Sequence, residues 1–302
     1  MSTREGFAAI DGVRLHYLEW GDRSRPHLLL VHGWDGTARY WDLVGPALQR
    51  GFHLVAVTLR GRGLSDPDPT GEYRFDGYVE ELRAFTRRLG LERLSWVGAS
   101  LGGLIGLRYV ARHPDQVDRL ALVDIGAQLG GDRPSSYYAG MLDAPDRFTS
   151  LGEADAWFRQ WTLYEKLPTS GMAIVLREHL EKAPDASWRW RYMHKLRVAQ
   201  RRVPREVLFP PQWVVLPQVG CPVLILHGTR SESLLPDVAM RTRDALPRAA
   251  LVQIPDCSHF PFLEAPEALI AHLARFLEDN GETERPESEV RGTDSGPSTF
   301  PE

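Results

Sequence analysis

Short apolar runs alternate with amphipathic segments along most of the chain. The amphipathic segments carry apolar residues at helical spacing, as in the series Tyr78, Leu82 and Phe85. Strands that alternate with helices predict a mainly parallel sheet covered by helices, which is the α/β class. The apolar runs predict strands near residues 7–10, 14–20, 27–31, 53–57, 93–98, 119–124, 222–227 and 250–254.

The strand pattern stops between Asp124 and Pro222, and helix-compatible segments rich in aromatic residues take its place. We therefore expect a helical cap inserted into the core. The C-terminal stretch is rich in Glu, Pro, Gly, Ser and Thr, so it has little to bury and is expected to be disordered. The expected divisions are a core of residues 1–126 and 216–280, a cap of residues 127–215 with helices near 136–143, 151–163, 170–182 and 187–203, and a tail of residues 281–302.

A serine stands between two glycines where an apolar run gives way to a helical pattern. The sequence GASLG begins at Gly98, after the strand-like residues 94–97 and at the start of the helix-like residues 101–113. A turn of this kind holds the serine in a strained backbone conformation and tolerates only minimal side chains two positions away. Ser100 is therefore the predicted nucleophile, and Gly98 and Gly102 supply the space.

A second glycine-containing turn follows the apolar run 28–31 and contains His32, Gly33 and Trp34. Backbone N–H groups at the end of a strand can bind the negative oxygen that forms when a nucleophile attacks a carbonyl group. We assign this oxyanion-binding role to the backbone N–H groups of Trp34 and Leu101. His32 and Gly33 are expected to support the turn.

These two turns, together with three later stretches, resemble the α/β-hydrolase family, and the resemblance covers most of the chain. The later stretches are RGRGLSD from Arg60, PVLILHG from Pro222 and CSHF from Cys257. The order nucleophile, acid, histidine is also the order of that family. The resemblance implies an eight-stranded, mostly parallel sheet, a cap above the carboxyl ends of the strands, and a Ser-His-acid triad that needs no metal and no organic cofactor.

The resemblance places the general base at His259, in a loop after the last predicted strand. The acid departs from the commonest pattern of the family, because the third residue after Gly228 is Ser231 instead of aspartate. Some members carry a Gly-x-x-Ser-Asp form, and Glu232 stands at its acidic position. We therefore favour Glu232 as the acid, and Asp124, at the end of an earlier strand, is the alternative.

The aromatic cap and the resemblance favour a serine hydrolase of the carboxylic ester hydrolase type. Such an enzyme cleaves an ester, lactone or related acyl bond of a small, largely apolar or aromatic substrate through an acyl-enzyme. Two alternatives stay open. One is a carbon–carbon bond hydrolase of the same fold, and the other is a non-catalytic receptor for a small ligand.

Charge and cysteine content narrow the remaining classes. The net charge of −4 belongs to the tail, whose residues 281–302 hold six carboxylates and two arginines, so the body is near neutral. A neutral body argues against nucleic-acid binding, despite the basic and aromatic stretch 188–197. Cys221 and Cys257 form no disulfide framework, and no signal segment or membrane span is evident. We expect a cytoplasmic protein that acts on a small molecule, without nucleic acid or membrane; its oligomeric state stays open.

Overall fold

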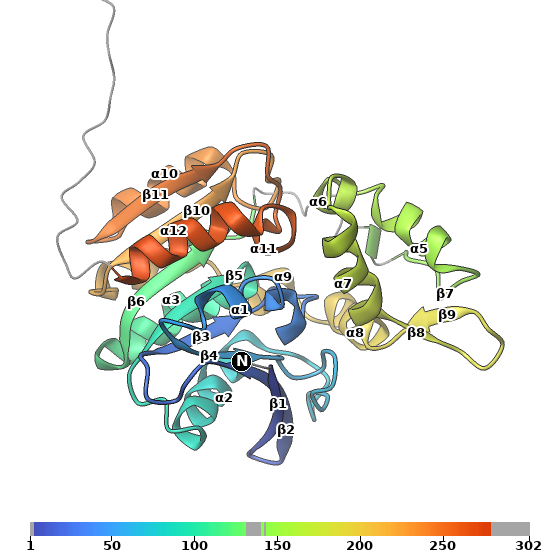
Figure 1. The fold of residues 1–302 in the computed structure, drawn as a ribbon, viewed down its shortest axis with the longest axis horizontal. Coiled ribbons are helices and arrows are strands. Elements are labelled where there is room, and N and C mark those ends of the chain that lie inside the picture. The colour runs from blue at the N-terminus through green and yellow to red at the C-terminus, as the bar shows by residue number, and fades with distance from the viewer. Residues whose placement is uncertain (1–2, 131–139, 142, 279–302) are drawn as a thin grey trace, which may run out of the picture.

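One eight-stranded sheet forms the centre of the computed structural model, which describes residues 3–130, 140–141 and 143–278 (Figure 1). In spatial order its strands are β1 (Arg4–Ile10), β2 (Val13–Trp20), β4 (His53–Val57), β3 (His27–Val31), β5 (Leu94–Ala99), β6 (Val117–Val123), β10 (Val223–Gly228) and β11 (Ala249–Ile254). Strand β2 is antiparallel to both of its neighbours, and all the other pairs are parallel. The predicted α/β architecture with a mostly parallel eight-stranded sheet is confirmed.

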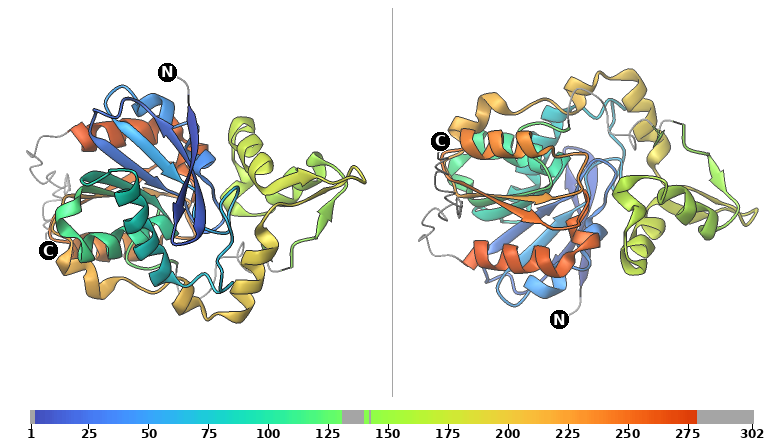
Figure 2. Two further views of the ribbon diagram at one scale, coloured as in Figure 1. Left: turned by 90° about the horizontal axis from the view of Figure 1, so that it is seen from below. Right: turned by 90° about the horizontal axis from the view of Figure 1, so that it is seen from above.

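Helices cover both faces of the sheet (Figure 2). On one face lie α1 (Gly45–Leu48) and α12 (Pro266–Glu278), and on the other lie α2 (Phe75–Arg88), α3 (Leu101–Arg112) and α10 (Pro236–Ala245). Tyr78, Leu82 and Phe85 of α2 are fully buried, as the helical spacing of apolar residues predicts. Two short 3-10 helices, η1 (Ala38–Trp41) and η2 (Pro114–Gln116), complete the connections.

The central strands are buried from both sides. All residues of β4 are buried, and so are four of the five residues of β3. Strands covered on both faces appear in a sequence as continuous apolar runs. For this reason β3 and β4 are predictable from sequence although their apolar and polar residues do not alternate. Because β3, β5, β6 and β10 are adjacent and parallel, the loops that follow them meet at one edge of the sheet.

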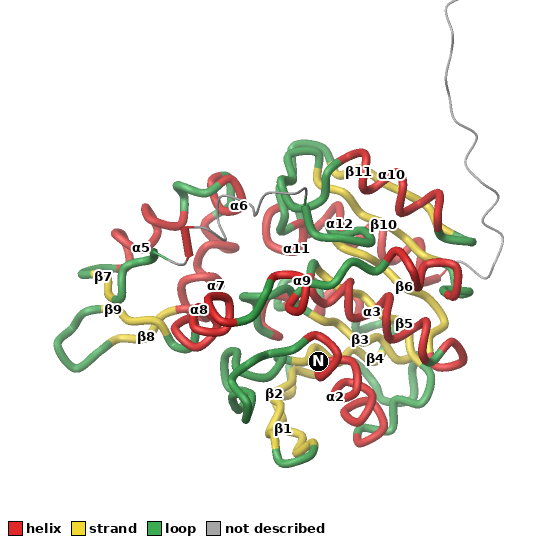
Figure 3. The backbone as a smooth tube through the Cα atoms, turned by 180° about the vertical axis from the view of Figure 1, so that it is seen from behind, coloured by secondary structure: helices red, strands yellow, loops and turns green. Residues whose placement is uncertain are grey.

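The chain between β6 and β10 forms an insertion that projects to one side of the sheet (Figures 1 and 2). One of its helices, α7 (Thr169–His179), contacts the core at η1 and at α11 (Pro261–Glu264). Figure 3 shows the insertion and the core from behind. In the described part of the chain, no helix of the core or the insertion has the length and hydrophobicity that a bilayer crossing requires. The insertion contains α5 (Leu151–Phe158), α6 (Thr162–Glu165), α7 (Thr169–His179), α8 (Met193–Arg202), α9 (Arg205–Leu208), η3 (Trp213–Gln218), β7 (Arg147–Phe148), β8 (Leu180–Lys182) and β9 (Trp188–Trp190).

The expectation of an insertion without strands is wrong. Strands β7, β9 and β8 form a small antiparallel sheet, so the helix predicted over 170–182 ends at His179 and the helix predicted over 187–203 begins only at Met193. The pairing partner of β9 is β7, about forty residues earlier, and local periodicity carries no information on such a distant partner. Most of the helix predicted near 136–143, and all of the tail 281–302, lie outside the described residues.

Candidate active site

Ser100 occupies a sharp turn between β5 and α3. Its backbone torsions are φ 50° and ψ −116°, a conformation that is strained for any residue with a side chain. The two flanking glycines permit the close approaches that the turn requires. A Cβ atom on Gly102 would lie 2.3 Å from the carbonyl oxygen of Val31, and one on Gly98 would lie 2.3 Å from the carbonyl oxygen of Gly102. Ser100 therefore sits where the sequence predicts a nucleophile elbow.

We expect Gly102→Ala to destabilise the fold, because its new methyl group would meet backbone that cannot move aside. The cost is about 3 kcal/mol of unfolding free energy, as for an overpacked core. Gly220→Ala is the control, since no atom lies within 4 Å of a Cβ at that position. Urea unfolding followed by circular dichroism measures both. Equal urea midpoints for the two variants would show that the backbone of β3 can move aside for a methyl group at residue 102.

The turn after β3 lies directly beside the serine, since a Cβ on Gly33 would lie 3.3 Å from Ser100 Cβ. His32 is fully buried, and its Nε2 accepts the N–H of Leu59 at 3.0 Å, so Nδ1 carries the proton and donates to the Gly33 carbonyl at 2.6 Å. A trans peptide unit points its C=O and N–H in opposite directions. The Trp34 N–H is therefore directed away from His32.

Arg62 holds the same turn from its other side. Its Nε donates to the Trp34 carbonyl at 2.9 Å, and its guanidinium lies 4.5 Å from the centre of the Trp34 ring. The Arg62 side chain is fully buried. With the carbonyl groups of Gly33 and Trp34 both bonded, the amide between them has little freedom to rotate. Sequence reasoning gave Arg62 no role, although an arginine between Gly61 and Gly63 in a loop after an apolar strand is a signal for a buried, loop-ordering cation.

Burial lowers the pKa of His32 to about 3, so His32 is neutral in the folded protein and charged in the unfolded chain at mildly acidic pH. The unfolded state then binds the extra proton, and the stability that His32 contributes is present above pH 6.5 and is lost as the pH falls. Between about pH 7 and pH 5 this loss is about 2 kcal/mol. We expect His32→Gln to flatten the pH dependence of urea unfolding by that amount. A variant with the wild-type slope would contradict the assignment of a buried neutral imidazole.

His259 lies in the loop between β11 and α11, and its Nδ1 is 2.7 Å from Oδ2 of Asp124. Asp124 follows β6 directly and is fully buried, whereas His259 is 5% exposed. Two further donors reach this carboxylate. The N–H of Gly228 donates to Oδ1 at 2.9 Å, and the hydroxyl of Ser231 donates to Oδ2. Asp124 is thus an acceptor for three donors, which satisfies both oxygens of this buried side chain.

Glu232, the favoured acid in the sequence analysis, points to the insertion. Its Oε1 accepts a hydrogen bond from the Thr162 hydroxyl of α6 at 2.8 Å. The structure joins His259 to the alternative acid, Asp124. Sequence reasoning also gave no role to Ser231. This residue stands at the position where the family usually has its acid, and its hydroxyl donates a hydrogen bond to the carboxylate of Asp124.

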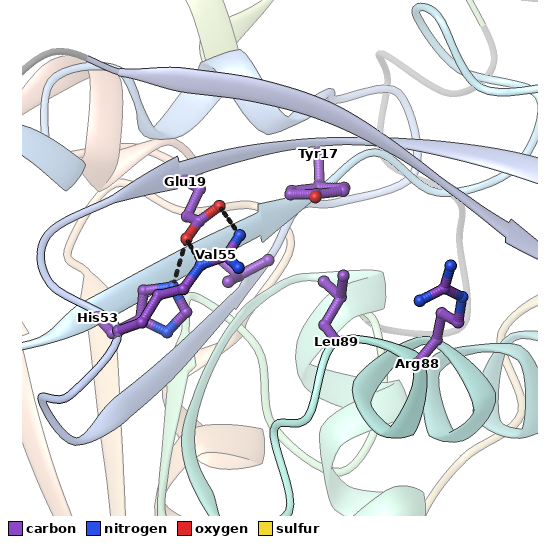
Figure 4. A pocket seen from close by; sticks show the side chains of 7 residues that line it. Tyr17, Glu19, His53, Val55, Arg88 and Leu89 are labelled. Atoms are coloured by element: carbon purple, nitrogen blue, oxygen red, sulfur yellow. Dashed lines mark hydrogen bonds and ion pairs between the residues drawn. The ribbon is translucent and has the colours of Figure 1, made fainter.

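A separate cavity of about 240 Å³ lies elsewhere on the sheet (Figure 4). Figure 4 shows the Glu19 carboxylate directed at His53, and their hydrogen bond measures 2.8 Å. Hydrogen bonds led by that of Arg23 lower the pKa of Glu19, so its charge is already balanced. His53 begins β4 whereas Ser100 follows the end of β5, so this cavity and the serine belong to opposite edges of the sheet. The cavity is lined by Tyr17, Glu19, Arg23, His53, Val55, Arg88 and Leu89.

The mostly parallel eight-stranded sheet and the strand-turn-helix arrangement around Ser100 are typical of the α/β hydrolase fold. The chain belongs to the α/β hydrolase fold family, whose model matches residues 26–266. Among the described residues, no group of three or more His, Cys, Asp or Glu side chains has an arrangement suited to a metal ion.

Several proteins similar to this chain are hydrolases. The chain is 28% identical over 287 residues to a 3-hydroxybutyrate-oligomer hydrolase of Cupriavidus necator, an alignment that covers 89% of this chain and 97% of the relative. It is 24% identical to Lipase 3 of a Moraxella species, with 84% of this chain and 78% of the lipase covered. The crystal structure of an α/β hydrolase from Novosphingobium aromaticivorans has the same fold, with a TM-score of 0.75, 24% identity, and coverage of 92% and 98%. The relatives support hydrolase activity for this chain.

Proposed function

We propose that this protein is a serine hydrolase that cleaves an ester, lactone or related acyl bond of a small, largely apolar or aromatic substrate. The observation that carries the proposal is the 2.7 Å hydrogen bond between the buried His259 and Asp124. Asp124 follows β6, and Ser100 follows β5, the strand beside it. An imidazole whose Nδ1–H is held by a carboxylate presents its Nε2 as a base. The proposal assigns the nucleophile to Ser100, the base to His259 and the acid to Asp124.

In the proposed reaction, Ser100 Oγ attacks the carbonyl carbon while His259 Nε2 takes the hydroxyl proton. The oxygen of the tetrahedral intermediate binds the N–H groups of Trp34 and Leu101. The first amides of a helix lack acceptors within the helix, and Leu101 is the first residue of α3. His259 then protonates the leaving alcohol, and water attacks the acyl-enzyme by the same steps. The carboxylic acid leaves and Ser100 regains its proton.

Aromatic side chains around these residues support an apolar substrate. The rings of Phe260 and His259 lie 5.2 Å apart, and Phe260 also packs against Tyr164 of the insertion at 5.1 Å. The ring of Trp34 packs against Phe209 at 5.0 Å. The relatives named for 3-hydroxybutyrate oligomers and for lipids point the same way, since both names describe esters with aliphatic acyl groups.

A substrate panel combined with covalent labelling tests the proposal. The panel contains p-nitrophenyl esters of increasing chain length, aryl esters, lactones, thioesters and a carbon–carbon hydrolase substrate, each scored by kcat/KM. A fluorophosphonate probe, which reacts with activated serines, should label the protein at Ser100, as located by peptide mass spectrometry. We expect turnover of at least one acyl substrate and labelling at that residue. Labelling without acyl turnover, together with cleavage of the carbon–carbon substrate, would favour the other reaction class; neither labelling nor turnover would favour a receptor.

A further inference from the structure

The segment that follows the oxyanion turn is bonded to the insertion along its whole length. Residues 35–42, here called the turn segment, include η1 and follow Trp34 directly. Elements of the insertion contact the segment from several sides. The bonds join Tyr164 Oη to Asp35 Oδ2 at 2.9 Å, Tyr192 Oη to the Asp35 carbonyl at 2.6 Å, Thr37 Oγ1 to Glu178 at 3.0 Å, Tyr40 Oη to His179 Nε2 at 2.7 Å, and Arg177 to Asp42 at 3.0 Å.

The two bonds at Asp35 are shielded from water. Asp35 is 5% exposed, Tyr192 is 3% exposed, and Tyr164 is fully buried. Burial raises the pKa of Tyr192 well above its usual value, and the charge of Asp35 raises it further, so its hydroxyl keeps the proton that it donates. A buried hydroxyl that loses its partner costs much more than one that can turn to solvent. These bonds therefore resist exchange with water.

The same part of the insertion also holds the histidine loop. Lys166 pairs with Asp256 at 2.8 Å, and the Ser258 hydroxyl, whose nearer acceptor is Glu264, lies 3.2 Å from the Leu163 carbonyl. Ser258 immediately precedes His259, and Leu163 immediately precedes Tyr164. Residues 162–166 thus contact both the turn segment and the loop that carries His259. The relative position of these two parts of the chain determines whether the His259 ring and the Trp34 N–H both face Ser100.

We propose that Tyr164 and Tyr192 are positioning residues that fix the oxyanion turn through Asp35, so that the seating of the insertion determines whether the oxyanion hole is formed. The inference rests on the proposed function for its consequence in catalysis. Asp35 shares a peptide with Trp34, so a shift of Asp35 moves the Trp34 carbonyl away from Arg62 and weakens one of the bonds that hold the Trp34 N–H in place. Donors to an oxyanion act only when they are already aligned before the charge develops.

The kinetic test uses Tyr164→Phe, Tyr192→Phe and the double variant, which keep the rings and remove only the hydroxyls. The control is Tyr109→Phe, because Tyr109 is equally buried and its hydroxyl bonds Thr86 and Gln116, away from the turn segment. We expect kcat to fall about tenfold in each single variant and about a hundredfold in the double variant, with KM within about threefold. Acylation and deacylation should slow together, since both pass through an oxyanion.

A second test examines the link between the two tyrosines and the turn segment independently of any catalytic activity. Amide hydrogen exchange over residues 33–38, read by mass spectrometry in a Ser100→Ala background, needs no activity at all. We expect exchange about tenfold faster in the double tyrosine variant and unchanged in Tyr109→Phe. Unchanged exchange in the double variant overturns the proposal whatever the rates are, and so does equal acceleration in the control. An active double variant with wild-type kcat overturns it as well, while an inactive wild-type protein would overturn only the proposed function.

Discussion

Ser100→Ala is expected to lower kcat/KM for the best acyl substrate by on the order of 10⁴-fold or more. The variant removes Ser100 Oγ, the protein atom that forms a covalent bond with the substrate in the proposed reaction. The residual rate comes from direct attack of water on the bound substrate, which the oxyanion-binding amides still stabilise. Fold and stability should stay near wild type, because alanine keeps the Cβ atom and the backbone strain at φ 50° is unchanged. The measurement is steady-state turnover together with the pre-steady-state burst of released alcohol.

Ser95→Ala is the matched control for this experiment, since Ser95 is a half-buried serine on β5, the strand that precedes Ser100. We expect its rate to stay within about threefold of wild type. The burst should be present in the control and absent in Ser100→Ala. A burst that survives in Ser100→Ala would place the nucleophile at another residue and would remove the basis of the acyl-enzyme mechanism.

The core of the fold is predictable from sequence because its signals are local. Buried parallel strands produce apolar runs, and each helix shows its buried face in the spacing of residues such as Leu82 and Phe85. The small sheet of the insertion is not predictable in this way. Strands of two or three residues are too short to show a period, and their identity depends on a partner distant in sequence.

The same distinction separates the parts of the candidate site. The strained turn at Ser100 follows from its own neighbours, because Gly98 and Gly102 leave room for the close backbone approaches that the turn requires. The acid depends on which strand ends are adjacent in space. Sequence placed Glu232 near His259 by analogy with a loop pattern, whereas the sheet order puts β6 beside β10 and brings Asp124 to His259. Ser231 was the available clue, since a serine at the usual acid position can serve as a donor to a carboxylate from elsewhere.

Asp124→Asn is expected to lower kcat by about 10⁴-fold with little change in KM. The carboxylate accepts hydrogen bonds from His259, Gly228 and Ser231, and an amide cannot accept from all of them. If the amide nitrogen faces His259, the imidazole must present an unprotonated Nδ1 and carry its proton on Nε2. That tautomer cannot take the proton of Ser100. Steady-state kinetics across pH measure the loss, and circular dichroism checks that the variant folds.

Glu232→Gln is the comparison that decides between the two acids. The glutamine oxygen can still accept the Thr162 hydroxyl, so the contact with α6 is kept and only the charge is lost. We expect a rate within about threefold of wild type, because His259 donates its orienting hydrogen bond to Asp124 and not to Glu232. The reverse outcome, with Asp124→Asn nearly normal and Glu232→Gln reduced about a thousandfold, would return the acid role to Glu232. It would also require the loop after β10 to rearrange when substrate binds, since Glu232 points to the insertion in this structure.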